Sequence, residues 1–136
     1  MADAIRRAHA RFPCSRPVEI LHGAASGTRL GTGILLDVSL SGAFLRFDGE
    51  LRVATPYRLR FESPDGSFEI PCRVVRLGPR GVPEAPQARH YGLNFNPTVE
   101  QERQLRRYVD LIRREPPAVE TPFDRALRDY WSGGAG

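Results

Sequence analysis

The stretch YRLRFESPDGSFEIPCRV, residues 57–74, carries the clearest strand pattern in the chain. In both of its halves an apolar side chain falls at every second position, with charged or polar residues and one proline, Pro71, between. A period of two places alternate side chains on opposite faces of a β-strand. The Pro-Asp-Gly at 64–66 predicts a turn, because proline presets one φ angle and glycine tolerates a positive one. Residues 57–77 are therefore predicted to form a β-hairpin.

Shorter strand patterns flank this hairpin on both sides. Upstream, alternation predicts strands at 17–22, 29–36 and 43–47; downstream, a loop at 78–88 precedes a last strand at 91–95. Six short strands followed by one helix are typical of a small closed sheet. We therefore expect a mainly β fold, a small six-stranded antiparallel β-barrel with a C-terminal α-helix.

The hydrophobic period changes after the last predicted strand. Thr98 followed by Gln101 resembles a capping box, and the apolar residues that follow lie at helical spacing until Pro116. The organisation expected is a mobile basic N-terminal arm at 1–16, the barrel at 17–97, the helix at 98–115 and a partly disordered tail at 116–136 with a short amphipathic segment.

Composition excludes several classes of protein. No apolar run approaches the roughly 20 residues that cross a bilayer, and the N-terminus lacks the apolar core of a signal peptide, so we expect a cytoplasmic protein without membrane insertion. Cys14 and Cys72 predict two reduced thiols rather than a disulfide framework. The histidines show no metal-ligand spacing, so no metal site is expected. No nucleophile–base pair or phosphate loop is apparent, so neither enzymatic activity nor a catalytic residue is expected.

The charge of the chain favours an anionic partner. The 20 basic residues are all arginine, against 16 acidic ones, which gives a net charge of +4. Arginine offers a planar fork of donors that matches phosphates and guanine edges. Because arginine is so frequent here, no arginine pair is a specific signal by itself.

Two short motifs narrow the function. Arg7-Ala-His-Ala-Arg11 has the form RxxxR, and Asp37-Val-Ser39-Leu-Ser-Gly42 has the form [D/N]xSxxG between two predicted strands. Together they resemble the PilZ domain family of cyclic di-GMP receptors. The runs GTGILLDVSLSGAFLRF and YGLNF and the helix extend the resemblance over most of the chain apart from the tail. The resemblance implies a module that binds cyclic di-GMP as a ligand, without a cofactor.

By this resemblance, Arg7 and Arg11 bind the guanine edge and the phosphates, while Asp37 and Ser39 take the other guanine face and Gly42 shapes the turn. The chemistry is consistent with these roles. An arginine fork satisfies guanine O6 and N7 together, for about 1–3 kcal/mol of discrimination. A carboxylate accepts from the N–H groups on the opposite edge of the base.

Arg6 is a secondary ligand-binding candidate. Placed just before the motif, it either stacks on a guanine and favours a second ligand molecule, as in resembling proteins, or remains an arm charge in solvent.

The function expected is a sensor and adaptor that changes conformation or partner binding when the ligand arrives. The signal then leaves through an unidentified downstream protein or through a ligand-linked homodimer. The alternatives are a ligand-independent protein–protein interaction module of the same fold and a small nucleic-acid-binding barrel. The second is weaker, because aromatic and basic residues fall on opposite strand faces.

Overall fold

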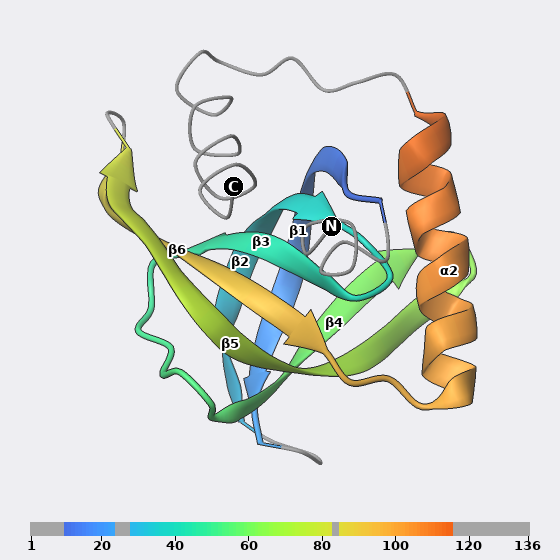
Figure 1. The fold of residues 1–136 in the computed structure, drawn as a ribbon, viewed down its shortest axis with the longest axis horizontal. Helices are drawn as coiled ribbons and strands as arrows, with labels where there is room; N and C mark the ends of the chain where they lie inside the picture. Colours follow the sequence, from blue (N-terminus) through green and yellow to red (C-terminus); the bar gives the residue numbers. More distant parts are fainter. Residues whose placement is uncertain (1–9, 24–27, 83–84, 116–136) are drawn as a thin grey trace, which may run out of the picture.

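Six antiparallel strands close into a barrel in the order β1-β2-β3-β6-β5-β4 (Figure 1). The computed structural model describes residues 10–23, 28–82 and 85–115. The elements are β1 (Phe12–His22), β2 (Arg29–Val38), β3 (Gly42–Phe47), β4 (Pro56–Ser63), β5 (Gly66–Val82), β6 (Ala85–Phe95) and α2 (Val99–Arg114). Pairing of β1 with β4 closes the ring. The predicted fold class, a six-stranded antiparallel barrel with a C-terminal helix, is confirmed.

The core fills the inside of the barrel with every second residue of each strand. On β3, Ala43, Leu45 and Phe47 belong to the core cluster, so the residues between them face outward. Four aromatic side chains of β4 and β6 join this cluster: Tyr57, Phe61 and Tyr91 are buried, and Phe95 packs against it half-buried. Alternation therefore identified the core correctly, because period two maps directly onto the two faces of a strand.

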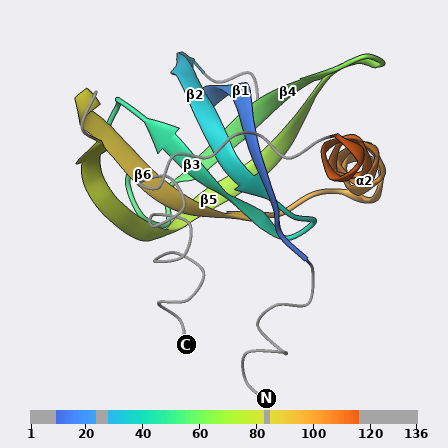
Figure 2. The ribbon, with the colours of Figure 1, turned by 90° about the horizontal axis from the view of Figure 1, so that it is seen from above.

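Helix α2 packs beside the barrel and adds one apolar face to the core (Figure 2). Its buried residues are Leu105, Tyr108, Val109 and Ile112. The predicted capping box is present: the Gln101 amide donates to Thr98 Oγ1 at 3.2 Å, and the Thr98 amide donates to Gln101 Oε1 at 2.9 Å. Within the described ranges, no helix has the length and apolar content that a membrane span requires.

Strand β1 begins earlier than the sequence analysis expects. It starts at Phe12, so residues 12–16 belong to the barrel and not to the predicted arm. The sequence over 1–16 is poorly periodic, so no strand is predicted there, and proline in addition cannot donate to a β-ladder. However, Pro13 lies beside a β-bulge, and the first half of β1 has a strand partner on one side only, since its pairing with β4 begins at Glu19. Both settings tolerate proline. The remainder of the predicted arm, residues 1–9, and the predicted tail lie outside the described residues.

The predicted loop at 78–88 is instead a long continuation of the β5–β6 hairpin. Strand β5 runs on to Val82 and β6 begins at Ala85. Register shifts interrupt the pairing between Leu77 and Val82, and Gly81 has a φ of 79°. Proline and glycine thus sit at bulges within a strand pair, where they are tolerated, and do not end it.

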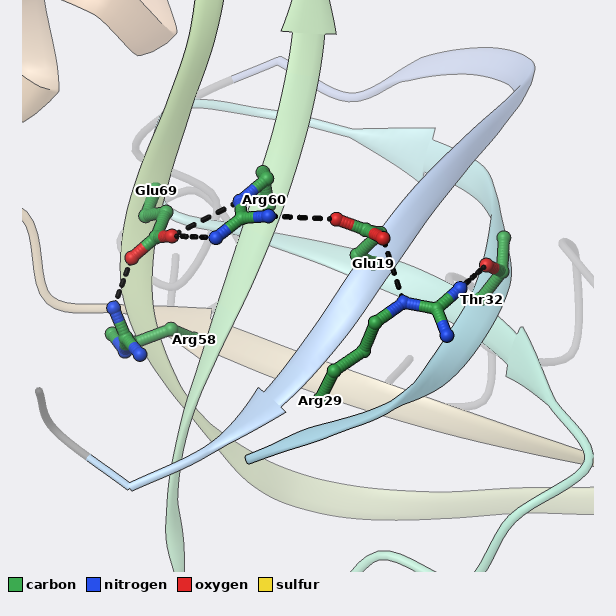
Figure 3. Close-up of polar contacts among 6 residues, drawn as sticks. All are labelled: Glu19, Arg29, Thr32, Arg58, Arg60 and Glu69. Carbon is green, nitrogen blue, oxygen red and sulfur yellow. Dashed lines mark hydrogen bonds and ion pairs between the residues drawn. The ribbon is translucent and has the colours of Figure 1, made fainter. Parts of the chain in front are cut away.

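One outer face of the barrel carries a chain of ion pairs across four strands (Figure 3). Arg60 bridges Glu19 and Glu69 with N–O distances of 3.0 and 2.7 Å. The chain continues at its two ends to Arg58, which pairs with Glu69, and to Arg29, which pairs with Glu19. These arginines are matched by carboxylates of the same chain, so this face is a weak candidate for binding an anionic ligand or nucleic acid.

The two thiols are free, as the sequence predicts. Burial raises the pKa of Cys72 to about 12, and burial together with the negative charge of Asp37 raises that of Cys14 to about 12. Both thiols keep their proton in the folded state above the ordinary value of 9.0. Folding stability from this source is therefore present below about pH 9 and is lost as the pH rises toward 12.

We therefore expect both cysteines to react slowly with a disulfide reagent at pH 8 in the folded protein, because the thiolate is the reactive species. Both should react at once in urea, which abolishes burial. Reaction kinetics with 5,5′-dithiobis(2-nitrobenzoate) measure this directly. Rapid labelling of either thiol in the folded protein would contradict the burial described for it.

Candidate functional site

The motif at 37–42 is divided between two strands and a short connection. Asp37 and Val38 are the last residues of β2, and Gly42 is the first of β3. The sequence places the whole motif between the predicted strands 29–36 and 43–47, whereas in the structure only residues 39–41 lie outside the strands. The distinction matters because a strand position fixes the direction of the Asp37 side chain, whereas a turn would not.

Asp37 is the electrostatic centre of the site. Its side chain is 1% exposed, and its Oδ1 accepts a hydrogen bond from the backbone amide of Phe44 at 3.1 Å. The same oxygen lies 3.0 Å from Arg11 Nη1. A buried carboxylate needs such donors, because desolvation without them is costly. The backbone of β3 thus holds the carboxylate in place, and the guanidinium compensates its charge.

Arg11 reaches this carboxylate from the residue just before β1. Its side chain is 23% exposed, so it lies at the edge of the site where a ligand can reach it. The register places Pro13, two residues later, opposite Asp37. The structure therefore brings the second arginine of RxxxR together with the first residue of [D/N]xSxxG, although 26 positions separate them.

Ser39 organises the turn from within. It is 1% exposed. Its hydroxyl accepts from the amides of Ser41 and Gly42, each at 3.1 Å, and donates to the Gly42 carbonyl at 3.2 Å. Its own amide donates to the same carbonyl at 2.8 Å. These contacts satisfy the backbone of a tight connection, which is the usual use of serine in turns.

Gly42 is required by the approach of β6. A Cβ atom at this position would lie 2.1 Å from the carbonyl oxygen of Leu93, which is backbone and has little freedom to shift. The expectation from the sequence is that this glycine shapes the turn beside a ligand. The structure supplies a different physical reason, a strand crossing too close for any side chain.

Arg6 and Arg7 lie outside the described residues. Among the described motif positions, Arg11 and Asp37 form the charged centre, while Ser39 and Gly42 hold the connection that positions it. The backbone amide of Phe44, which donates to the Asp37 carboxylate, could not be predicted from the sequence. No sequence signal marks it, because any residue supplies an amide and only the register selects this one.

The described part of the site offers a guanidinium beside a fixed carboxylate. In the described ranges, no three His, Cys, Asp or Glu side chains gather as metal ligands would. A carboxylate and an arginine fork suit a ligand with both N–H donors and phosphate or carbonyl acceptors.

Comparisons with known proteins identify the family. The chain is similar to the PilZ domain of CeSA from a cellulose-synthesizing bacterium, with 23% identity, a TM-score of 0.59 and coverage of 76% of this chain and 98% of that one. It is also similar to the PilZ domain of YcgR from Escherichia coli, solved with c-di-GMP, with 18% identity, a TM-score of 0.59 and coverage of 80% and 92%. The motility inhibitor MotI/DgrA of Bacillus subtilis gives 19% identity, a TM-score of 0.55 and coverage of 81% and 54%. No curated protein matches significantly.

These structural likenesses agree with the fold, and the sequence itself carries the assignment. The model of the PilZ domain family matches residues 5–111, which include both motifs, the whole barrel and most of α2. The chain belongs to the PilZ domain family.

Proposed function

We propose that this chain is a cyclic di-GMP sensor and adaptor that binds the nucleotide beside Arg11 and Asp37 and changes its partner contacts in response. The observation that carries the proposal is the 3.0 Å pair between Arg11 and a fully buried Asp37. A buried carboxylate that is already fixed loses little conformational freedom when a guanine donates to it. An arginine has five N–H donors in a rigid fork, so one guanidinium can serve a carboxylate and a phosphate together.

Family membership supports the same ligand. YcgR of Escherichia coli and MrkH of Klebsiella pneumoniae have both been solved with c-di-GMP, and MrkH is described as a transcription regulatory factor that depends on it. The retained motif positions in this chain argue against the ligand-independent module. The ion-paired outer face in Figure 3 argues against nucleic acid as the partner.

A route from ligand to partner runs through the start of β1. The chain on either side of Arg11 lines a hollow of about 230 Å³ against α2 and the β2–β3 connection. Its lining residues are Ala10, Phe12, Leu40, Arg106, Val109, Asp110 and Arg113. A ligand that repositions Arg11 therefore alters the shape of this hollow. A downstream protein or a second copy of the chain can then bind it with a different affinity.

Isothermal titration calorimetry with cyclic di-GMP tests the proposal. We expect the wild-type protein to bind with a micromolar or lower Kd, and Arg11→Ala to weaken binding by about tenfold to hundredfold, as loss of a charge-assisted hydrogen bond does. Arg103→Ala is the matched control: it removes the same charge from an exposed position on α2, and binding should stay within about twofold. Absence of binding and of any thermal shift in the wild type would contradict the proposal and favour the ligand-independent module.

A further inference from the structure

Two β-bulges on different strands turn charged side chains onto the same outer face. On β2, Leu35 belongs to the core, and strict alternation would point Asp37 inward with it. A register shift between these two residues inserts Leu36 and sends Asp37 to the outside. Bulges are frequent beside functional sites because they re-aim a side chain in this way.

A second β-bulge of this kind lies on β5. Val74 is a core residue, so alternation would also point Arg76 into the barrel. A register shift between them leaves Val75 unpaired and 48% exposed, and turns Arg76 outward. Burying an arginine inside the barrel would cost far more free energy than exposing a valine to solvent. The bulge therefore places the side chain of Arg76 on the outer face of the barrel.

The strand register aligns the two re-aimed residues in one row. Asp37 pairs with Phe44, Phe44 pairs with Gly92, and Gly92 pairs with Arg76. Directly paired residues share a face of the sheet. Asp37 and Arg76 therefore stand at the two ends of a row that crosses β2, β3, β6 and β5, separated along the curved sheet by three strand spacings of roughly 4.8 Å.

The middle of this row is filled and apolar. Phe44 is fully buried and stacks on His90, with ring centroids 5.6 Å apart and an interplanar angle of 22°. Arg46 donates to His90 Nε2 at 3.1 Å, and His90 Nδ1 lies 2.6 Å from the Pro79 carbonyl oxygen, so both ring nitrogens have a partner. The charged groups of the row consequently stand at its ends, which suits an elongated ligand with two polar halves.

We infer that Arg76 is a further ligand-binding residue, which contacts the half of the cyclic dinucleotide farther from Asp37. The inference rests on the proposed function. Arg11 and Asp37 take one guanosine monophosphate, and Arg76 donates from the opposite end of the row to a phosphate or guanine acceptor of the other. An arginine fork matches either group.

Calorimetric titration of Arg76→Ala, Arg76→Lys and Arg80→Ala with cyclic di-GMP tests this assignment. We expect Arg76→Ala to weaken binding by about tenfold to hundredfold and Arg76→Lys to recover part of that loss, because lysine keeps the charge but not the fork. Arg80 lies on the same strand and is exposed. Its replacement removes the same charge outside the row, so binding should stay within about twofold. Circular dichroism and thermal unfolding of each variant check that the barrel is intact.

Two results overturn the inference in distinguishable ways. Wild-type affinity in a folded Arg76→Ala variant removes Arg76 from the site and leaves the proposed function standing. A wild-type protein that binds no cyclic di-GMP removes both. An equal loss of affinity in Arg76→Ala and Arg80→Ala would show that net charge, and not the position of Arg76 in the row, causes the effect. This result would also overturn the inference.

Discussion

Replacement of Gly42 by alanine is expected to lower the free energy of unfolding by about 3 kcal/mol, the upper end of what overpacking costs. The added Cβ would lie 2.1 Å from the Leu93 carbonyl oxygen and 3.2 Å from its carbon. Relief requires β3 and β6 to separate where Gly42 pairs with Asn94. Such a loss is a large part of the roughly 5–15 kcal/mol that holds a domain folded. Urea denaturation measures it.

Ser41→Ala is the control for Gly42→Ala. Ser41 is the adjacent residue in the same connection and is exposed, so its replacement should change the free energy of unfolding by less than about 1 kcal/mol. A Gly42→Ala protein as stable as the wild type but unable to bind cyclic di-GMP would contradict the packing argument. It would instead support the role beside the ligand that the sequence suggests.

Replacement of Asp37 by alanine is expected to abolish measurable binding, a loss of more than about a hundredfold, and to destabilise the barrel by about 2–3 kcal/mol. The binding loss follows from removal of the acceptor for guanine. The stability loss follows from the buried amide of Phe44, which loses the Asp37 oxygen that accepts from it. Arg11 loses its 3.0 Å partner as well. Calorimetry and urea denaturation of the same preparation measure the two effects separately.

Asp37→Asn separates the charge from the hydrogen bond. Its amide oxygen can still accept from Phe44 and Arg11, so the free energy of unfolding should stay within about 1 kcal/mol of the wild type. Binding should weaken less than in Asp37→Ala, in keeping with the [D/N] position of the motif. If the Ala variant kept wild-type affinity, Asp37 would be a structural residue only.

The elements of this fold that could be predicted from the sequence are those that depend on local pattern. Residues close together in the sequence are enough to predict three of these features. They are the β4–β5 hairpin, the core positions of the strands and the Thr98–Gln101 cap. Errors arose at residues 12–16, where the sequence is poorly periodic, and along 78–82, where proline and glycine indicated an end to regular structure. Bulges and a one-sided strand accommodate them, and neither setting is visible before the strands are paired.

The candidate site likewise has a part that local sequence pattern predicts and a part that depends on strand pairing. The barrel, the helix and the residues of the two motifs can be predicted from the sequence, because period, capping and motif spacing are local properties. Four features depend on how the strands are paired. Arg11 contacts Asp37, the Phe44 amide holds this carboxylate, β6 excludes a side chain at Gly42, and Arg76 faces outward. These features follow from the strand register. One inserted residue in a strand reverses the face of every side chain after it, and the local sequence pattern does not show where that residue is inserted.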